Sequence, residues 1–104
     1  MGAAKQNKMK SKDKSNIKSI TLEVIQTDGS IRKAETPPKE LLKTLQDLVG
    51  GIIQTVPMKY DPSHLVVCHE EGRLLGLPWN KIASQLTRND IVGDCVVVKV
   101  EDFI

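Results

Sequence analysis

The sequence is poor in aromatic residues and in cysteine. Its 104 residues include one Trp, one Tyr, one Phe and two Cys. With so few aromatics, the core must be built from Ile, Leu and Val, and a chain of this length fits a single domain. Cys68 and Cys95 both lie in apolar, strand-like stretches. We expect two buried free thiols on neighbouring strands, since a disulfide scaffold would need more cysteines and a secretory signal.

Long hydrophobic runs are also missing. No stretch approaches the roughly 18 apolar residues of a membrane-spanning helix, and the first residues have no apolar signal core. We therefore expect a cytoplasmic protein without membrane contacts.

Charge is distributed unevenly along the chain. Residues 1–18 hold six Lys and one Asp, a charge of +5, whereas the remainder holds nine basic and twelve acidic residues, a charge of −3. Residues 1–16 have little to bury and predict a disordered, lysine-rich tail, followed by one α+β domain over residues 17–104. The tail lysines that could bind nucleic acid weakly and in a salt-sensitive way are Lys5, Lys8, Lys10, Lys12 and Lys14.

Hydrophobic periodicity locates the elements of the domain. Alternation predicts a strand over 17–25, the Asp28-Gly29 pair predicts a tight turn, and 30–35 returns as a polar strand with Ile31 facing inward. A helix follows Pro37-Pro38 and ends at Gly50-Gly51. Its predicted apolar face consists of Leu41, Leu42, Leu45, Leu48 and Val49.

The second half of the chain predicts four more strands and one more helix. A strand over 52–58 ends at Pro57, a loop covers 58–64, and strands follow over 64–70, 73–77 and 91–102. Residues 81–86 predict a short helix for which Asn80 is the expected N-cap. The predicted fold class is α+β: a mostly antiparallel sheet of about five to six strands, covered by one main helix plus a short second helix.

Three segments resemble a known protein family. They are LQDLVGGIIQTVPM, HEEGRLLGLPWN and DIVGDCVVV. Over about residues 41–94 the chain resembles the uncharacterised family called domain of unknown function 3846, which occurs in phages and bacterial mobile elements. The family usually has a second Pro at the position of Trp79. The resemblance implies a phage or mobile-element origin and no assigned activity.

Catalytic and metal-binding motifs are absent from the sequence. His64 and His69 are five residues apart on a predicted strand, which places them on opposite faces, and the zincin spacing is missing. Cys68 and His69 also point to opposite faces, so they cannot form a nucleophile and base pair. The glycine-rich phosphate motifs are missing as well. We expect no catalytic residues, no metal, no cofactor and no enzymatic activity.

The segment around Trp79 is the candidate binding surface. A Trp in a predicted loop could anchor a partner if it is exposed, or close the core if it is buried. Burial is the favoured interpretation in a chain so poor in aromatics. The candidate binding residues are Trp79, Asn80, Lys81, Arg73 and His69.

Three functional hypotheses follow from these observations. The leading one is a non-enzymatic accessory protein that binds a protein partner, or a second copy of itself, through a sheet edge and the Trp79 loop. An alternative is a dimeric small-molecule or nucleotide binder that uses His69, Arg73, Asn80 and Lys81 as polar contacts. The third is weak nucleic-acid binding through the tail, which an acidic domain without an aromatic ladder does not favour.

Overall fold

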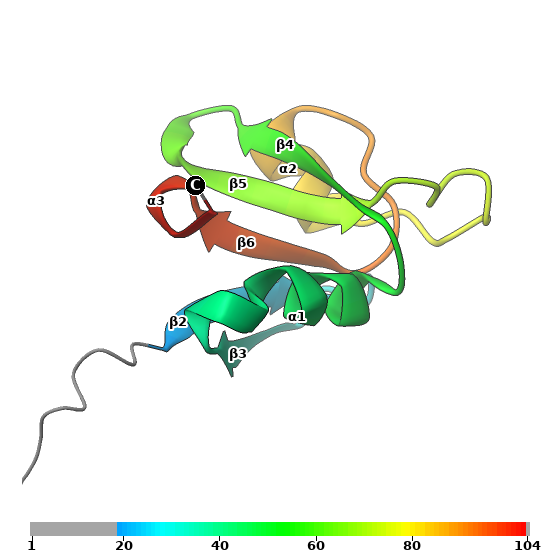
Figure 1. The fold of residues 1–104 in the computed structure, drawn as a ribbon. Coiled ribbons are helices and arrows are strands. Elements are labelled where there is room, and N and C mark those ends of the chain that lie inside the picture. The colour runs from blue at the N-terminus through cyan, green and yellow to red at the C-terminus, as the bar shows by residue number, and fades with distance from the viewer. Residues whose placement is uncertain (1–18, 104) are drawn as a thin grey trace, which may run out of the picture.

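A computed structural model describes residues 19–103, so the tail lysines lie outside the described residues. The described part forms one five-stranded, fully antiparallel sheet with the strand order β3-β2-β6-β5-β4 (Figure 1). The predicted α+β class is confirmed. The strands are β2 (Ile20–Ile25), β3 (Ile31–Thr36), β4 (Ile53–Met58), β5 (Asp61–His69) and β6 (Cys95–Lys99). The helices are the 3-10 turn η2 (Pro38–Glu40), α1 (Leu41–Val49), α2 (Lys81–Thr87) and α3 (Val100–Phe103).

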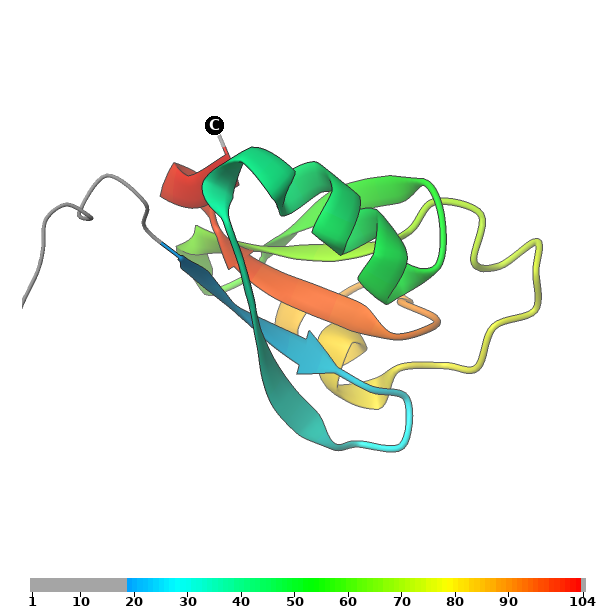
Figure 2. The ribbon, with the colours of Figure 1, turned by 60° about the horizontal axis from the view of Figure 1, so that its bottom comes forward.

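The two longer helices lie on opposite faces of the sheet (Figures 1 and 2). Alternate residues of each strand point to opposite faces, so each face can supply its own apolar cluster. The α1 face buries Ile20, Leu22, Val24, Leu41, Leu45, Val49, Val67, Val96 and Val98. The α2 face buries Ile25, Val66, Cys68, Ala83, Ile91, Cys95 and Val97. Each face of the sheet therefore carries its own core, and both cores consist almost wholly of aliphatic side chains.

The three helix-terminus signals found in the sequence are confirmed. Pro38 lies at the start of η2, and Gly50 ends α1 in the left-handed region with φ 91°. Asn80 caps α2 by accepting a hydrogen bond from the backbone N–H of Ala83. These terminal residues set the helix boundaries because the free N–H and C=O groups at helix ends need partners.

One predicted strand and one predicted loop are wrong. Residues 73–77 form no strand but belong to a run of turns, held by local bonds such as that from the N–H of Leu77 to the carbonyl of Gly72. In Figure 1 this segment extends beyond the sheet, where no strand is available to pair with it. The predicted loop over 58–64 is instead a two-residue turn at Lys59 and Tyr60, because β5 already begins at Asp61.

The ends of two other strands also differ from expectation. β4 continues through Pro57, which an edge strand tolerates because one side of it makes no ladder bonds. The last strand stops at Lys99, and Val100 starts the short helix α3.

Two residues expected to face inward are exposed. Ile31 is 54% exposed: it pairs with Ile25, so it faces the α2 side, but it lies on the edge strand β3 and is not part of the buried cluster on that side. Thr36 and the half-buried Ala34 are the inward residues of β3. Leu42 is 58% exposed because it lies at the margin of the apolar stripe of α1.

Candidate functional site

The candidate site is an open hollow of about 770 Å³ beside α2. Three segments that are distant in sequence form it: the β4–β5 turn, the long loop after β5, and α2 with the turn that follows. The lining side chains are Tyr60, Arg73, Trp79, Ser84, Gln85, Arg88, Asn89 and Asp90. The hollow therefore combines two aromatic rings with two guanidinium groups and one carboxylate.

Trp79 is 55% exposed, so the favoured expectation of burial is wrong. Its backbone forms an isolated β-bridge with Val92. On either side, the N–H of Asn80 donates to the carbonyl of Ile91 and the N–H of Gly93 donates to the carbonyl of Pro78, at 2.8 and 2.7 Å. The indole is thus carried by a fixed backbone at the rim of the hollow, an arrangement that lowers the entropy lost on binding.

Asn80 occupies the buried position next to Trp79. Its side-chain oxygen accepts from the N–H of Ala83 at 3.0 Å, and its amide nitrogen donates to the carbonyls of Ile25 and Gly93 at 3.0 and 2.9 Å. The side chain is 1% exposed. Asn80 is therefore a structural link between α2, β2 and the segment before β6. The sequence suggested it as a binding residue, but it is not among the residues that line the hollow.

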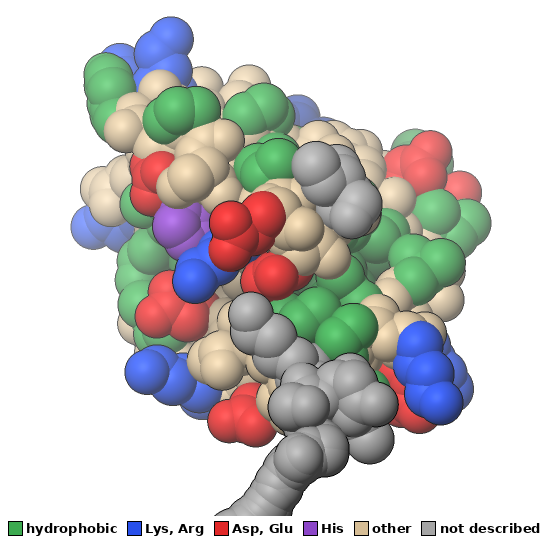
Figure 3. All heavy atoms as spheres, turned by 60° about the vertical axis from the view of Figure 1, so that its left-hand side comes forward, with side chains coloured by type: hydrophobic (Ala, Val, Ile, Leu, Met, Phe, Trp, Pro, Cys, Tyr) green, Lys and Arg blue, Asp and Glu red, His purple; other side chains and the backbone are tan. Residues whose placement is uncertain are grey.

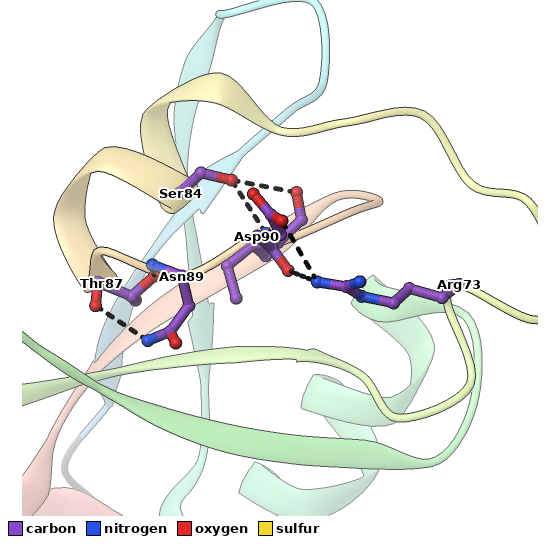
Figure 4. A network of polar contacts seen from close by, with 6 residues as sticks. Arg73, Ser84, Thr87, Asn89 and Asp90 are labelled. Atoms are coloured by element: carbon purple, nitrogen blue, oxygen red, sulfur yellow. Dashed lines mark hydrogen bonds and ion pairs between the residues drawn. The ribbon is translucent and has the colours of Figure 1, made fainter.

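Arg73 reaches from the long loop to the turn after α2 (Figure 4). Its guanidinium donates to the backbone carbonyl of Asp90 at 2.9 Å and lies 3.7 Å from the Asp90 carboxylate. The hydroxyl of Ser84 is bonded to both the N–H and the carbonyl of Ile91, which fixes this turn against α2. The loop is consequently attached to the rest of the hollow through Arg73.

Arg88 forms the opposite part of the hollow with Tyr60. Its guanidinium donates to the Tyr60 hydroxyl at 3.0 Å. The turn that carries Tyr60 is held to α2 by the bond from the N–H of Lys59 to the carbonyl of Leu86. These two residues were missed from the sequence because 28 positions separate them, and nothing local indicates that they meet.

The other sequence-derived candidates lie apart from these groups. Lys81 is exposed at the start of α2 and is not among the residues that line the hollow. His69 is buried, accepts a hydrogen bond from the N–H of Glu71, and lies against Gly51. With Arg73 it lines a smaller hollow of about 140 Å³. Of the five candidates, the structure brings only Trp79 and Arg73 to the large hollow.

A second polar cluster lies at the start of β5. The hydroxyl of Ser63 donates to the Asp61 carboxylate, and Nδ1 of His64 lies 2.9 Å from both Ser63 Oγ and the second Asp61 oxygen. The Ser63 hydroxyl is the main cause that lowers the pKa of Asp61. A nucleophile–base–acid triad needs the serine and the acid on different nitrogens of the imidazole. Here both share Nδ1, so the arrangement is that of a capped turn.

The two cysteines are free and buried, as expected. They lie on the α2 face of the neighbouring strands β5 and β6. Burial raises the pKa of Cys68, and burial, Cys68 and Asp94 together raise the pKa of Cys95 from 9.0 to about 12. The thiolate, which is the reactive form, is therefore disfavoured at both positions.

We predict that neither thiol reacts with a thiol reagent in the folded protein at pH 8. Titration with Ellman's reagent should detect no thiol in buffer and two in guanidinium chloride, since the chain has two cysteines. Rapid stoichiometric labelling of the folded protein would contradict the burial of both side chains.

Charged groups elsewhere on the described surface are mixed in sign. On the face shown in Figure 3, acidic and basic side chains alternate with hydrophobic ones. Among residues 19–103, no three His, Cys, Asp or Glu side chains are grouped so that they could hold a metal ion. No helix in that range is long and apolar enough to cross a membrane.

Comparison with known proteins gives one match. No curated protein and no solved structure matches the chain. The family described as "Domain of unknown function (DUF3846)" matches residues 17–104, which extends the resemblance seen over about residues 41–94 to the whole described domain. The chain therefore belongs to the DUF3846 family.

Proposed function

We propose that this domain is a non-enzymatic binding protein that acts through protein–protein contacts made by the hollow around Trp79. One observation carries the proposal. The chain has one Trp, one Tyr and one Phe, and Trp79 and Tyr60 line the same hollow with Arg73 and Arg88. Trp, Tyr and Arg are the residues that most often dominate the binding energy of protein interfaces.

The shape and setting of the hollow support a macromolecular partner. Small-molecule sites are mostly enclosed and apolar, whereas this hollow is open and about half of its lining surface is polar. The adjoining loop carries Leu74 and Leu75, both exposed. Exposed apolar side chains next to aromatic anchors are typical of an interaction surface.

The sheet edges are less suited to partner binding than the Trp79 loop, although the sequence suggested both. β3 carries Arg32, Lys33 and Glu35 along its edge, and β4 contains Pro57. Charged residues and proline on edge strands hinder pairing with another strand. We therefore assign partner binding to the hollow and its loop, and leave both sheet edges out of the proposal.

A non-enzymatic role agrees with the polar groups of the described residues. Cys68 and Cys95 are buried, and the cluster of Asp61, Ser63 and His64 lacks the geometry of a triad. The resemblance drawn from the sequence adds the proposal of an accessory protein of a phage or another mobile element, and the two free cysteines agree with a reducing compartment such as the cytoplasm.

We predict that Trp79→Ala weakens capture of the partner by at least about tenfold, as expected for the loss of an interface anchor. The chain and its variants are immobilised and exposed to lysate of the native host. Leu42→Ala is the matched control, because it removes an exposed apolar side chain from α1, on the opposite face of the sheet. Equal recovery of every partner by Trp79→Ala and Leu42→Ala would reject the hollow as the binding surface.

A nucleotide ligand is the competing hypothesis, because an exposed indole beside arginines can also stack on a base. A thermal-shift panel of nucleotides separates the two, since a ligand that binds the folded state raises the melting temperature. The protein-binding proposal expects no shift with any nucleotide.

A further inference from the structure

We infer that the partner segment docked in this hollow is acidic, and that Arg88 and Tyr60 together bind a carboxylate of that segment. This inference rests on the proposed function and names the chemistry of its partner.

Arg88 has hydrogen-bonding capacity that the fold does not use. A guanidinium has five N–H donors, and Nη1 of Arg88 donates to the Tyr60 hydroxyl. The ion pairs among the described residues are Lys43–Asp47, His64–Asp61 and Arg73–Asp90, so Arg88 belongs to none of them. Because the Tyr60 oxygen accepts from Arg88, its own proton can be donated to a ligand. Two adjacent donors, one of them charged, therefore border the hollow.

Arg73 provides a contrast within the same hollow. Its guanidinium is already bound to the carbonyl of Asp90 and lies near the Asp90 carboxylate. The negative charge of Asp90 partly compensates the positive charge of Arg73. An incoming carboxylate therefore gains more from Arg88, and the two arginines form a matched pair for a test.

The side chain of Arg88 is carried on a backbone conformation that favours glycine. Arg88 ends α2 with φ 59°, and it is the only non-glycine residue with positive φ in the described part of the chain. Glycine is preferred at such a position because a side chain strains the left-handed conformation. Residues in strained conformations cluster at functional sites, where the side chain has a use that offsets the strain.

The charge of the domain favours a protein segment over a nucleic acid. The hollow carries two guanidinium groups and one carboxylate, a charge of +1, within a region from residue 19 onward that has nine basic and twelve acidic residues. Nucleic-acid binding depends on neutralising several phosphates. A single carboxylate beside an apolar side chain needs one free arginine and one exposed ring, which Arg88 and Trp79 supply.

Selection from a random peptide library displayed on phage tests the inference. The targets are the full chain, Arg88→Gln and Arg73→Gln. We expect peptides enriched in Asp and Glu on the full chain and on Arg73→Gln, with no such enrichment on Arg88→Gln. The best acidic peptide should bind Arg88→Gln about ten- to a hundredfold more weakly, which corresponds to losing a charge-assisted hydrogen bond, and Arg73→Gln less than about threefold more weakly.

A second variant separates binding from folding. Arg88→Gly should lose the acidic peptide while its melting temperature stays equal to or rises above that of the unmodified chain. A lower melting temperature would assign Arg88 a structural role and overturn the inference.

The remaining outcomes distinguish this inference from the proposed function. Peptides without an acidic preference that still require Trp79 would overturn the inference and support protein binding. Failure to enrich any peptide above the Trp79→Ala background would overturn both. A fluorescent oligothymidylate that binds in an Arg88-dependent manner and displaces the peptides would identify a nucleic-acid occupant and overturn both.

Discussion

Replacing Asn80 with Ala should lower the free energy of unfolding by about 2 to 4 kcal/mol, a large part of the stability of a domain this small. The side chain is buried and makes one capping bond and two bonds to backbone carbonyls. Loss of the cap costs about 1 kcal/mol, and loss of the two buried bonds from the amide nitrogen to the carbonyls adds to it. Urea denaturation followed by circular dichroism measures the change.

Asn89→Ala is the matched control for this experiment. Asn89 is exposed, and its amide donates to one carbonyl, that of Thr87, within the same turn. We expect its loss to change the unfolding free energy by no more than about 0.5 kcal/mol. Equal effects of Asn80→Ala and Asn89→Ala would show that the three buried bonds contribute little.

Asn80→Asp separates the capping bond from the two carbonyl bonds. A carboxylate can still accept from Ala83, but it faces the carbonyls of Ile25 and Gly93 without a donor. We expect it to destabilise the domain at neutral pH at least as much as Ala does. Burial and the two carbonyl oxygens raise the pKa of this carboxyl above its unfolded value of about 4, so the deficit should shrink as the pH falls from neutral toward about 4, where protonation has removed the charge and supplied one O–H donor.

Asn80 also explains why Trp79 was misjudged from the sequence. Burial of Trp79 was favoured from the sequence because the chain is so poor in aromatics, whereas Asn80 was expected only as an N-cap and a candidate binding residue. The structure buries the Asn because its side-chain oxygen accepts a hydrogen bond at the helix start and its amide nitrogen donates to two backbone carbonyls. These hydrogen-bond partners of Asn80 come together only in the tertiary arrangement of β2, α2 and the segment before β6, so the sequence does not reveal them.

Local patterns predicted the elements that depend on local chemistry. The alternation in β2, the glycine after α1 and the cap of α2 are all confirmed, because each is decided by neighbouring residues. The segment 73–77 was misassigned because its apolar residues fit a strand, although the fold places no partner strand beside it. Strand formation depends on that partner as much as on the sequence.

The hollow could not be predicted from the sequence for a related reason. Tyr60, Arg73, Trp79 and Arg88 come from three segments, and the sequence shows none of the contacts between them. Trp79 was selected as a candidate because it is a large apolar residue in a predicted loop, and Arg73 because it could be a polar contact to a small molecule or nucleotide. Tyr60 lies in the stretch predicted as a loop and Arg88 follows the helix predicted over 81–86, and neither position carries a local signal of binding.

The helix α1 yields the second large prediction: Leu45→Ala should cost about 2 to 5 kcal/mol of unfolding free energy. Leu45 has no exposed surface and packs against the strands on its face of the sheet. Its truncation would leave a cavity in a core that contains little besides aliphatic side chains. Such a core has few flexible groups that could collapse into the space, which places the expected loss toward the upper half of this range.

Leu42→Ala is the matched control, and the comparison tests how the apolar face of α1 should be defined. With about 100° per residue, Leu45 lies at the centre of the stripe, and Leu42 and Leu48 lie about 60° to either side. Leu42 is accordingly exposed and Leu48 only half-buried, although the sequence placed all three on one face. We expect Leu42→Ala to change the urea midpoint by an amount equivalent to no more than about 0.5 kcal/mol. Similar losses for both variants would mean that Leu42 is covered in solution, and that α1 carries an interface in addition to the core.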